Sequence, residues 1–438
     1  MADARPFHWE FKELPIQREA FRVEGGRALR GDVEISGSKN AALKLLAAAT
    51  LTGERCRFTN VPEIADVQVM VEALRDLGVV VDHPAPHTYE VAAGDVDWLF
   101  VPLEAAAKMR ASFILLGPLL ARFGRVIISN PGGDRIGRRP VNLHVDAMRA
   151  LGAEIDYRNG YYFARAPGRL RGTDLVFPDV TVMGTENALL AATLAEGHTT
   201  IRPAAREPEV DDLIAFLQHM GAEVERTAPD VIEVEGRRRL RGANHQVISD
   251  RIEAGTFAIA AAITGGDVTL HGCPSEHLGA FLDLLASMGV SIETQGDTLH
   301  VRGTGEYAAA DVRTGAYPDL ATDLQPPTAV LLTQARGISR IHETIFEDRL
   351  EWMSELRRMG ADIDIEDDHH ASITGPCQLH GSELEMSDLR AGASLMLAAL
   401  VADGPSLIHG AHQVRRGYEN IERKFLDLGA RIEHVSEA

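Results

Sequence analysis

The amino-acid sequence predicts an α/β protein of two domains, each an inside-out α/β barrel built from three βαβαββ-type repeats. Three observations predict this fold. One segment recurs six times at near-equal spacing, an amphipathic helix precedes each copy, and each repeat carries a second helix that is almost wholly apolar. A chain of 438 residues is also too long for one ordinary hydrophobic core, which favours more than one domain.

The recurring segment starts with a large apolar residue and a glycine, followed by a small residue and an alternating strand. Its copies begin 68 to 74 residues apart and occupy 77–82, 151–156, 220–225, 288–293, 359–364 and 428–433. The glycine suits the C-terminal end of the preceding helix, where a left-handed residue is often needed. Because polar and apolar residues alternate after the glycine, we expect a strand with one buried face.

Two kinds of helix are expected in each repeat. In the amphipathic helix of the third repeat, Val210, Leu213, Ile214 and Leu217 lie at positions i, i+3, i+4 and i+7, which places them on one face. The other helix, such as the one in 111–123, is apolar on most faces and must therefore be buried. Three repeats can bury three such helices inside a shell of sheets.

Six repeats divide into two domains of three. We expect the first domain to span residues 40–248 and to carry the loop around Asp134. The opening strands, 21–39, precede the first full repeat, so we assign them to the second domain together with 249–438. Residues 1–20 form an N-terminal extension. The chain then crosses twice between the domains, and the cleft between domains is a usual place for a ligand.

Composition and charge exclude several classes of partner. The chain has a normal apolar content and a net charge of −20, so nucleic acid and anionic membrane surfaces are not expected partners. The longest apolar runs are too short to span a bilayer, and the N-terminus lacks the apolar core of a signal peptide. We therefore expect a cytoplasmic protein.

The cysteines give no framework for a disulfide network or a metal site. There are three, Cys56, Cys273 and Cys377, and none stands in the paired spacing of a zinc site. Sparse cysteines are typical of a protein in a reducing compartment. We expect no metal.

The stretch PGGDRIGRRP, 131–140, is a candidate anion-binding loop. Asp134 is crowded there by Arg135, Arg138 and Arg139, and the proline and glycines indicate a loop. Arginines clamp phosphate and carboxylate groups by two-pronged bonding. The alternative is that Asp134 only forms salt bridges with its neighbours on a solvated loop.

Nine motifs occur in the order and spacing of a known family. They are SGSKNAAL (36–43), KMRAS (108–112), PGGDRIGRRPVNLH (131–144), AAREPEV (204–210), SDRIEAGTF (249–257), ATDLQ (321–325), ETIFEDR (343–349), SDLRAGASL (387–395) and RRGYENIE (415–422). With these motifs and the sixfold repeat, the chain resembles the enolpyruvyl transferases, in particular the branch that acts on UDP-N-acetylglucosamine. The resemblance runs from about residue 21 to the C-terminus.

The resemblance implies a reaction. In this branch the enolpyruvyl group of phosphoenolpyruvate moves to the 3-hydroxyl of UDP-N-acetylglucosamine, and phosphate leaves through a tetrahedral intermediate. No metal or organic cofactor is implied. The reaction is the first committed step of peptidoglycan synthesis, and therefore serves cell-wall biogenesis, cell shape, the cell cycle and cell division.

The resemblance also implies roles for basic residues. Lys39 would contact phosphoenolpyruvate and Asn40 would lie near the sugar, whereas a lysine at a helix start is in isolation usually solvated. Arg139 and Arg416 would hold the phosphate and the carboxylate. Arg390, at the start of a buried helix, is likewise matched to the closed cleft.

Arg349 is also matched to the closed cleft, with an alternative role as a structural partner for Glu347 or Asp348. The positions matched to the sugar nucleotide are Arg110, Arg139, Pro140, Val141, Asn142, Leu143 and Ile345. The family usually has aspartate where this chain has Asn142, so a side-chain contact at this position would be altered. Ile345 has an alternative role as a core residue.

Two carboxylates are matched to the chemistry. Asp323 would accept the proton of the sugar 3-hydroxyl or orient that hydroxyl, with a helix N-cap as the alternative. The pair Pro326–Pro327 after it departs from the family pattern. Asp134 stands where most family members have the cysteine that fosfomycin alkylates, and a minority have aspartate. Asp134 would then donate a proton to the methylene carbon of phosphoenolpyruvate or assist product release, and the enzyme would be insensitive to fosfomycin.

Two other functions remain open from the sequence. A sister family, 5-enolpyruvylshikimate-3-phosphate synthase, shares the architecture and the reaction, although several motifs match the UDP-sugar branch better. A paralogue that binds nucleotide sugar without catalysis is the second, and the retained Lys39, Asp134, Asp323 and Arg416 speak against it.

Overall fold

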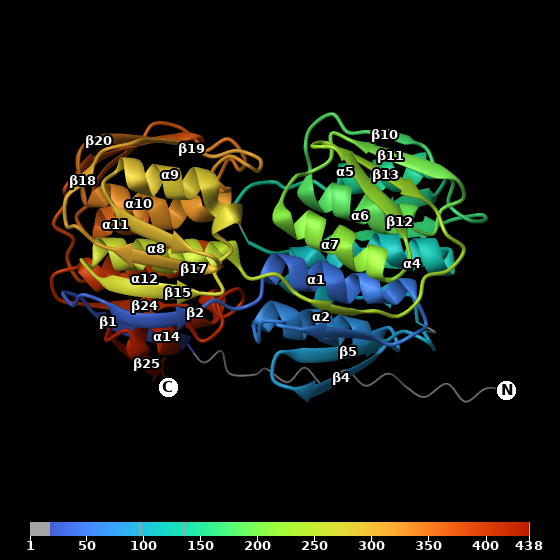
Figure 1. Cartoon of the computed structure of the whole chain (residues 1–438), viewed down its shortest axis with the longest axis horizontal. Helices are drawn as coiled ribbons and strands as arrows, with labels where there is room; N and C mark the ends of the chain where they lie inside the picture. The colour runs from blue at the N-terminus through green and yellow to red at the C-terminus, as the bar shows by residue number, and fades with distance from the viewer. Residues whose placement is uncertain (1–17, 97, 135, 438) are drawn as a thin grey trace.

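The computed structural model describes residues 18–96, 98–134 and 136–437. Two lobes lie side by side (Figure 1) and carry separate hydrophobic cores. Residues 1–17 of the expected extension lie outside the described residues. Residues 18–20, which the sequence analysis placed in the extension, belong instead to strand β1 of the second domain.

The first domain has three sheets around its core. Its helical segments are α1 (Lys39–Ala48), η1 (Ala49–Leu51), α2 (Ala65–Asp76), α3 (Leu103–Lys108), η2 (Arg110–Leu115), α4 (Leu116–Phe123), α5 (Asn142–Ala150), α6 (Val182–Ala192) and α7 (Pro208–His219). Its strands are β3 (Cys56–Thr59), β4 (Val80–Ala85), β5 (Thr88–Ala92), β6 (Phe100–Val101), β7 (Arg125–Ser129), β8 (Glu154–Arg158), β9 (Tyr161–Arg165), β10 (Asp174–Val176), β11 (His198–Arg202), β12 (Glu223–Ala228), β13 (Val231–Glu235) and β14 (Asn244–Gln246).

The second domain repeats this arrangement. Its helical segments are α8 (Arg251–Ile263), η3 (Ser275–Leu278), α9 (Gly279–Ser287), η4 (Thr322–Leu324), α10 (Gln325–Thr333), α11 (Met353–Arg358), α12 (Leu389–Val401), α13 (Ala411–Val414) and α14 (Ile421–Asp427). Its strands are β1 (Arg18–Glu24), β2 (Arg30–Glu34), β15 (Asp267–His271), β16 (Ser291–Gln295), β17 (Thr298–Arg302), β18 (Tyr307–Ala308), β19 (Asp311–Arg313), β20 (Ala335–His342), β21 (Asp362–Ile365), β22 (His370–Gly375), β23 (Glu383–Glu385), β24 (Pro405–His409) and β25 (Arg431–Glu437).

The six sheets share one plan. In the first domain the strand orders are β14-β3-β5-β4, β6-β7-β9-β8 and β10-β11-β13-β12, and in the second they are β16-β17-β15-β2, β18-β20-β22-β21 and β23-β24-β1-β25, with β19 also on β20. Within the first sheet, β14 and β3 are parallel whereas β5 runs antiparallel to β3 and β4. Each repeat therefore contributes a mixed sheet, which confirms the predicted α/β class.

The glycine of every repeat ends its helix as expected. All six have a positive φ, between 89° and 98°, and they are Gly78, Gly152, Gly221, Gly289, Gly360 and Gly429. Residues with a side chain rarely adopt this conformation, and glycine does so without strain.

Apolar helices occupy the middle of each domain and the sheets lie outside them. Every residue of α8 and of α10 is buried, and α8, α10 and α12 pack against one another. In the first domain α4 packs against α6. The inside-out barrel predicted from the sequence is confirmed, because helices that are apolar on most faces can only be buried.

The two chain crossings between the domains lie side by side. Strand β2 pairs in parallel with β15 of the second domain, and β14 returns to pair with β3 of the first. A bridge between Gly37 and Ser249 joins the two crossings. A side chain at Gly37 would overlap the backbone of Asn60, so glycine is required there. Both crossings lead directly into buried helices, α1 and α8, whose N-terminal ends therefore face the junction of the domains.

No helix in the described part of the chain combines the length and the apolar character needed to cross a membrane.

Candidate active site

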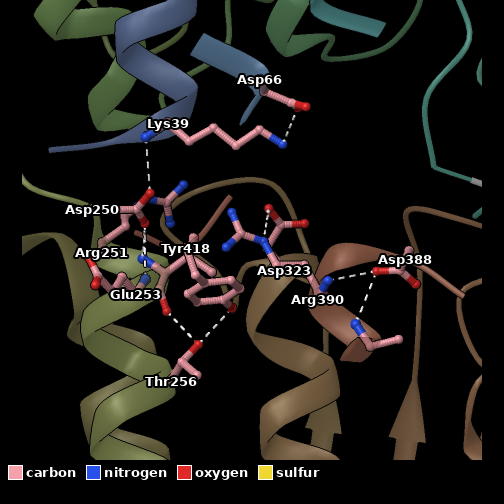
Figure 2. A network of polar contacts seen from close by, with 12 residues as sticks. Lys39, Asp66, Asp250, Arg251, Glu253, Thr256, Asp323, Asp388, Arg390 and Tyr418 are labelled. Carbon is pink, nitrogen blue, oxygen red and sulfur yellow. Dashed lines mark hydrogen bonds and ion pairs between the residues drawn. The ribbon is translucent and has the colours of Figure 1, made fainter. Parts of the chain in front are cut away.

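Lys39 is held by carboxylates from both domains. It starts α1, which Ser38 caps by accepting a hydrogen bond from the backbone of Ala41. The Lys39 ammonium donates to Asp66 at 2.8 Å, and its backbone N–H donates to Asp250 at 3.1 Å. Figure 2 shows this lysine stretched between the two aspartates. Asn40 follows it in the first turn of α1.

Arg416 joins the same cluster from the second domain. Its Nε donates to Asp66 at 3.1 Å and its Nη1 donates to Asp134 at 2.5 Å. Asp66 therefore bridges Lys39 and Arg416, and Asp134 reaches the far side of the arginine. Two cations and two carboxylates form a neutral chain across the domain junction.

The electrostatic environment keeps Asp134 ionised. Burial acts to raise the pKa of its carboxyl, but the charges of Arg416 and then Lys39 outweigh burial and lower the pKa below its usual value. Conversely, burial alone would lower the pKa of the Arg416 guanidinium, while Asp66 and Asp134 raise it. Both partners are therefore charged at neutral pH.

Asp323 forms a second charged centre with two buried arginines. Its carboxylate accepts from Arg349 Nη2 and Arg390 Nε, each at 3.2 Å. Burial opposes ionisation, but the charges of Arg390 and Arg349 lower the pKa of the Asp323 carboxyl well below its usual range. The sequence-based alternatives are not observed: Asp323 caps no helix, and Arg349 pairs with Asp323 in place of its chain neighbours Glu347 and Asp348.

The proline pair after Asp323 is accommodated without a break. Pro326 and Pro327 lie in the first turn of α10, where the backbone N–H groups have no partner within the helix and proline is tolerated. The short η4 segment before it then places Asp323 at the mouth of this buried helix.

Arg390 and Arg349 have bonding capacity left over. Arg390 lies in the first turn of α12, whose start Asp388 caps, and its guanidinium lies 5.0 Å from the ring centroid of Tyr418. Figure 2 shows Arg390 between Asp323 and Tyr418. Within the described part of the chain, the buried Arg349 Nε and Arg390 Nη1 have no hydrogen-bond partner. Unpartnered guanidinium nitrogens of this kind are suited to bind an anion.

The 131–140 loop bonds to the second domain. The backbone N–H of Arg138 donates to the Glu347 carboxylate at 2.9 Å, and the carbonyl of Ile136 accepts from the backbone of Asp348 at 3.3 Å. Gly137 has φ of +140°, and a side chain there would overlap the Glu347 carboxylate. Glycine is thus required for this contact. Arg135 of the predicted clamp lies outside the described residues.

Arg139 reaches the second domain from the 131–140 loop. Its φ of 44° is left-handed, and its guanidinium lies 5.4 Å from the ring centroid of Phe346. Burial lowers the pKa of Arg139, the charges of Asp134 and Asp323 raise it, and Arg349 lowers it further. The net effect is a lowered pKa for Arg139, whose charge interacts with both carboxylates.

A cavity of about 410 Å³ adjoins the loop and holds most of the residues matched to the sugar nucleotide. Its lining includes Arg110, Asn130, Pro131, Arg138, Arg139, Pro140, Val141, Asn142, Val145, Asp146, Arg149, Tyr157 and Tyr162. Arg110 donates to the carbonyls of Arg139 and, at 3.2 Å, Pro140, and burial lowers the pKa of Arg110 to about 10.

Two matched residues lie apart from this cavity. Leu143 packs against the core of the first domain, and Ile345 lies in the second domain with 39% of its surface exposed. A larger cavity of about 920 Å³ covers the outer face of the β6-β7-β9-β8 sheet, near Trp98 and Phe163, and contains none of the predicted site residues.

The sequence analysis gave no site role to four residues that shape the site. Asp66, Asp250, Glu347 and Tyr418 all contact predicted site residues. Asp250 had a visible signal, because SDRIEAG places an aspartate before a helix. Asp66 gave none, since it lies in an ordinary amphipathic helix.

Comparisons with known proteins agree with this architecture. The family model described as EPSP synthase (3-phosphoshikimate 1-carboxyvinyltransferase) matches residues 23–425. A UDP-N-acetylglucosamine 1-carboxyvinyltransferase of Solibacter usitatus is 45% identical over 418 residues, covering 95% of this chain and 100% of the relative. One of Azorhizobium caulinodans is 44% identical over 428 residues, with 95% and 100% covered.

Solved structures show the same fold. The enolpyruvyl transferase NikO of Streptomyces tendae aligns with a TM-score of 0.88 at 26% identity, covering 96% of this chain and 100% of NikO. An EPSP synthase of Acinetobacter baumannii aligns with a TM-score of 0.73 at 21% identity, covering 95% and 100%. The chain therefore belongs to the carboxyvinyltransferase family that the EPSP synthase model describes, and it is an enzyme of the transferase class.

Proposed function

We propose that this enzyme transfers the enolpyruvyl group of phosphoenolpyruvate to the 3-hydroxyl of UDP-N-acetylglucosamine and releases phosphate, the first committed step of peptidoglycan synthesis. The observation that carries the proposal is the meeting of cations from both domains around Asp134 and Asp323: Lys39 from the first, and Arg349, Arg390 and Arg416 from the second. The names of the relatives at 44–45% identity support the choice of acceptor.

Phosphoenolpyruvate binds where carboxylates now neutralise the cations. Lys39, Arg139 and Arg416 surround Asp134, and a phosphate with a carboxylate can replace Asp134 on Arg416 by two-pronged bonding. The unpartnered nitrogens of Arg390 and Arg349 provide further donors. Lys39 near the bridging oxygen stabilises the charge that develops there as phosphate leaves.

Asp323 receives the proton of the attacking hydroxyl. Its lowered pKa keeps it ionised and able to accept a hydrogen bond from the 3-hydroxyl, which is what general-base assistance requires. The hydroxyl oxygen bonds to the central carbon of phosphoenolpyruvate while its proton passes to Asp323. The methylene carbon gains a proton in the same addition, and a tetrahedral intermediate results.

Asp134 supplies the proton to the methylene carbon, as an aspartate in place of the cysteine usual in the family. Paired with Arg416 it is ionised, so it must change its environment to act as an acid. When phosphoenolpyruvate takes over Arg416, the positive charge next to Asp134 is cancelled and its pKa rises. Asp134 then takes up a proton from solvent and donates it to the methylene carbon. When phosphate leaves and the double bond re-forms, the methyl carbon returns a proton to Asp134, and the proton held by Asp323 passes to the departing phosphate or to solvent.

The sugar nucleotide occupies the cavity beside the loop. Arg110 sets the position of the Arg139 and Pro140 carbonyls, so Pro140, Val141 and Asn142 form its wall. Leu143 and Ile345 contribute apolar contacts from the two domains. The proposed enzyme works in the cytoplasm with small-molecule substrates only, and the aspartate makes it insensitive to fosfomycin.

Phosphate release tests this function. Purified enzyme given phosphoenolpyruvate should release phosphate only when UDP-N-acetylglucosamine is added. Release with shikimate 3-phosphate as the sole active acceptor would assign it to the sister reaction. Binding of UDP-N-acetylglucosamine without any phosphate release would make it a nucleotide-sugar-binding paralogue.

A further inference from the structure

Glu343 is a buried carboxylate outside the charged clusters described above. It follows strand β20 and is 0% exposed. One oxygen accepts from the backbone N–H groups of Ile345 at 2.8 Å and Phe346 at 3.3 Å, and the other accepts from the Thr322 hydroxyl at 3.0 Å. Its bonds come from neutral donors, and no Lys, Arg or His of the described chain forms an ion pair with it.

The three bonds reach two different parts of the proposed active site. Thr322 directly precedes Asp323 in the η4 segment. Ile345 and Phe346 directly precede Glu347, which bonds to the 131–140 loop. The Arg139 guanidinium lies over the ring of Phe346. One carboxylate is therefore bonded both to the segment of the proposed base and to the segment that contacts the Asp134 loop.

The backbone of Glu343 is itself firmly placed. Its N–H donates to the carbonyl of His369 at 2.8 Å, and its carbonyl lies 2.7 Å from His369 Nδ1. The next residue, Thr344, bonds to Thr314 through its backbone at 2.9 Å and its hydroxyl at 2.8 Å. Glu343 thus acts from the end of an interior strand, β20, which is a rigid reference point.

We infer that Glu343 is a positioning residue for the proposed enolpyruvyl transfer, holding Asp323 and the 345–349 segment at a fixed separation through Thr322. Both Glu343 carboxyl oxygens act as acceptors, which matches the two N–H groups and the hydroxyl presented to them. Arg349 of the 345–349 segment pairs with Asp323 at 3.2 Å. A shift of Thr322 therefore moves the Asp323 carboxylate relative to Arg349. The inference rests on the proposed function.

Substitution of Thr322 tests the inference without leaving the two backbone N–H groups unpaired. Thr322→Val removes only the hydroxyl bond, and Thr322→Ser restores it. Thr193→Val is the matched control, because the buried Thr193 hydroxyl likewise donates one hydrogen bond, to the carbonyl of Leu190 at 2.8 Å, in the core of the first domain away from Glu343. Phosphate release at saturating substrates and the thermal unfolding midpoint are measured for all three variants and the wild type.

The expected result is a kcat about tenfold lower for Thr322→Val, because loss of one buried hydrogen bond has an effect of about this size, with the KM for UDP-N-acetylglucosamine nearly unchanged. Thr322→Ser recovers most of kcat, and Thr193→Val keeps kcat despite a lower unfolding midpoint. A wild-type kcat for Thr322→Val, or an equal loss of kcat in Thr193→Val, overturns the inference. An inactive wild type in the same assay overturns the proposed function and the inference with it.

Discussion

Replacement of Asp134 by asparagine should strengthen the binding of phosphoenolpyruvate and, at the same time, lower kcat. In the free enzyme Asp134 occupies Arg416 at 2.5 Å, with 15% and 16% of the two side chains exposed. Phosphoenolpyruvate must displace this carboxylate before Arg416 can hold a substrate anion. Asp134→Asn removes the competing charge and keeps the shape of the side chain.

The expected gain in affinity for phosphoenolpyruvate follows from the hydrogen bond between Asp134 and Arg416. A hydrogen bond to a charged group at a mostly buried site contributes about 1.5–3 kcal/mol, and each 1.4 kcal/mol is about tenfold in affinity. We therefore expect Asp134→Asn to bind phosphoenolpyruvate roughly tenfold to a hundredfold more tightly. Loss of the proton donor should lower kcat by about a hundredfold or more.

Titration calorimetry gives the dissociation constant of phosphoenolpyruvate in the presence of UDP-N-acetylglucosamine, and phosphate release gives kcat. Asp211→Asn is the control: this exposed aspartate pairs with Arg226 outside the site, so both constants should match those of the wild type. If Asp134→Asn binds phosphoenolpyruvate as weakly as the wild type or more weakly, Asp134 does not compete with the substrate and the reasoning fails.

Three further predictions follow from the two carboxylates. Asp323→Asn should lower kcat about a hundredfold to a thousandfold while UDP-N-acetylglucosamine still binds, and Asp323→Glu should recover part of it; a wild-type kcat in Asp323→Asn phosphate-release assays would remove its role as base. Since the pKa values of Asp134 and Asp323 are lowered in the fold, the stability they contribute is present above the unfolded pKa of about 4 and is lost as pH falls below it. The thermal midpoint should therefore fall steeply below about pH 4, and less steeply in the variant carrying Asp134→Asn and Asp323→Asn; equal slopes contradict this. Intact-protein mass should show no adduct after fosfomycin and UDP-N-acetylglucosamine, because Cys56 and Cys273 are buried with pKa values raised to about 11 and about 12; Asp134→Cys should gain the adduct, and an adduct on the unchanged chain would refute the assignment.

The fold could be predicted from the sequence because its signals are local. The helix-ending glycines, such as Gly78 and Gly221, and the apolar helices, such as α8, depend on residues a few positions apart. Each signal is weak alone, but it recurs in all six repeats. Because the apolar helices must be buried, the sheets must lie outside them.

The bonding pattern of the site could not be read in this way. Asp66 meets Arg416 across 350 positions of sequence, and Asp134 meets it across 282. Whether two such residues bond depends on how the domains meet, which no local pattern encodes. Glu343 was similarly hidden, because a glutamate after a strand gives no sign that it will be buried with only neutral donors around it.

The central claim is tested most directly by identifying the product made from phosphoenolpyruvate and UDP-N-acetylglucosamine. Mass spectrometry and proton NMR of the quenched reaction should show a sugar nucleotide in which an enolpyruvyl group has replaced the hydrogen of the 3-hydroxyl, formed in equal amount to the phosphate released. Recovery of unchanged UDP-N-acetylglucosamine from an enzyme that binds both substrates would contradict the account.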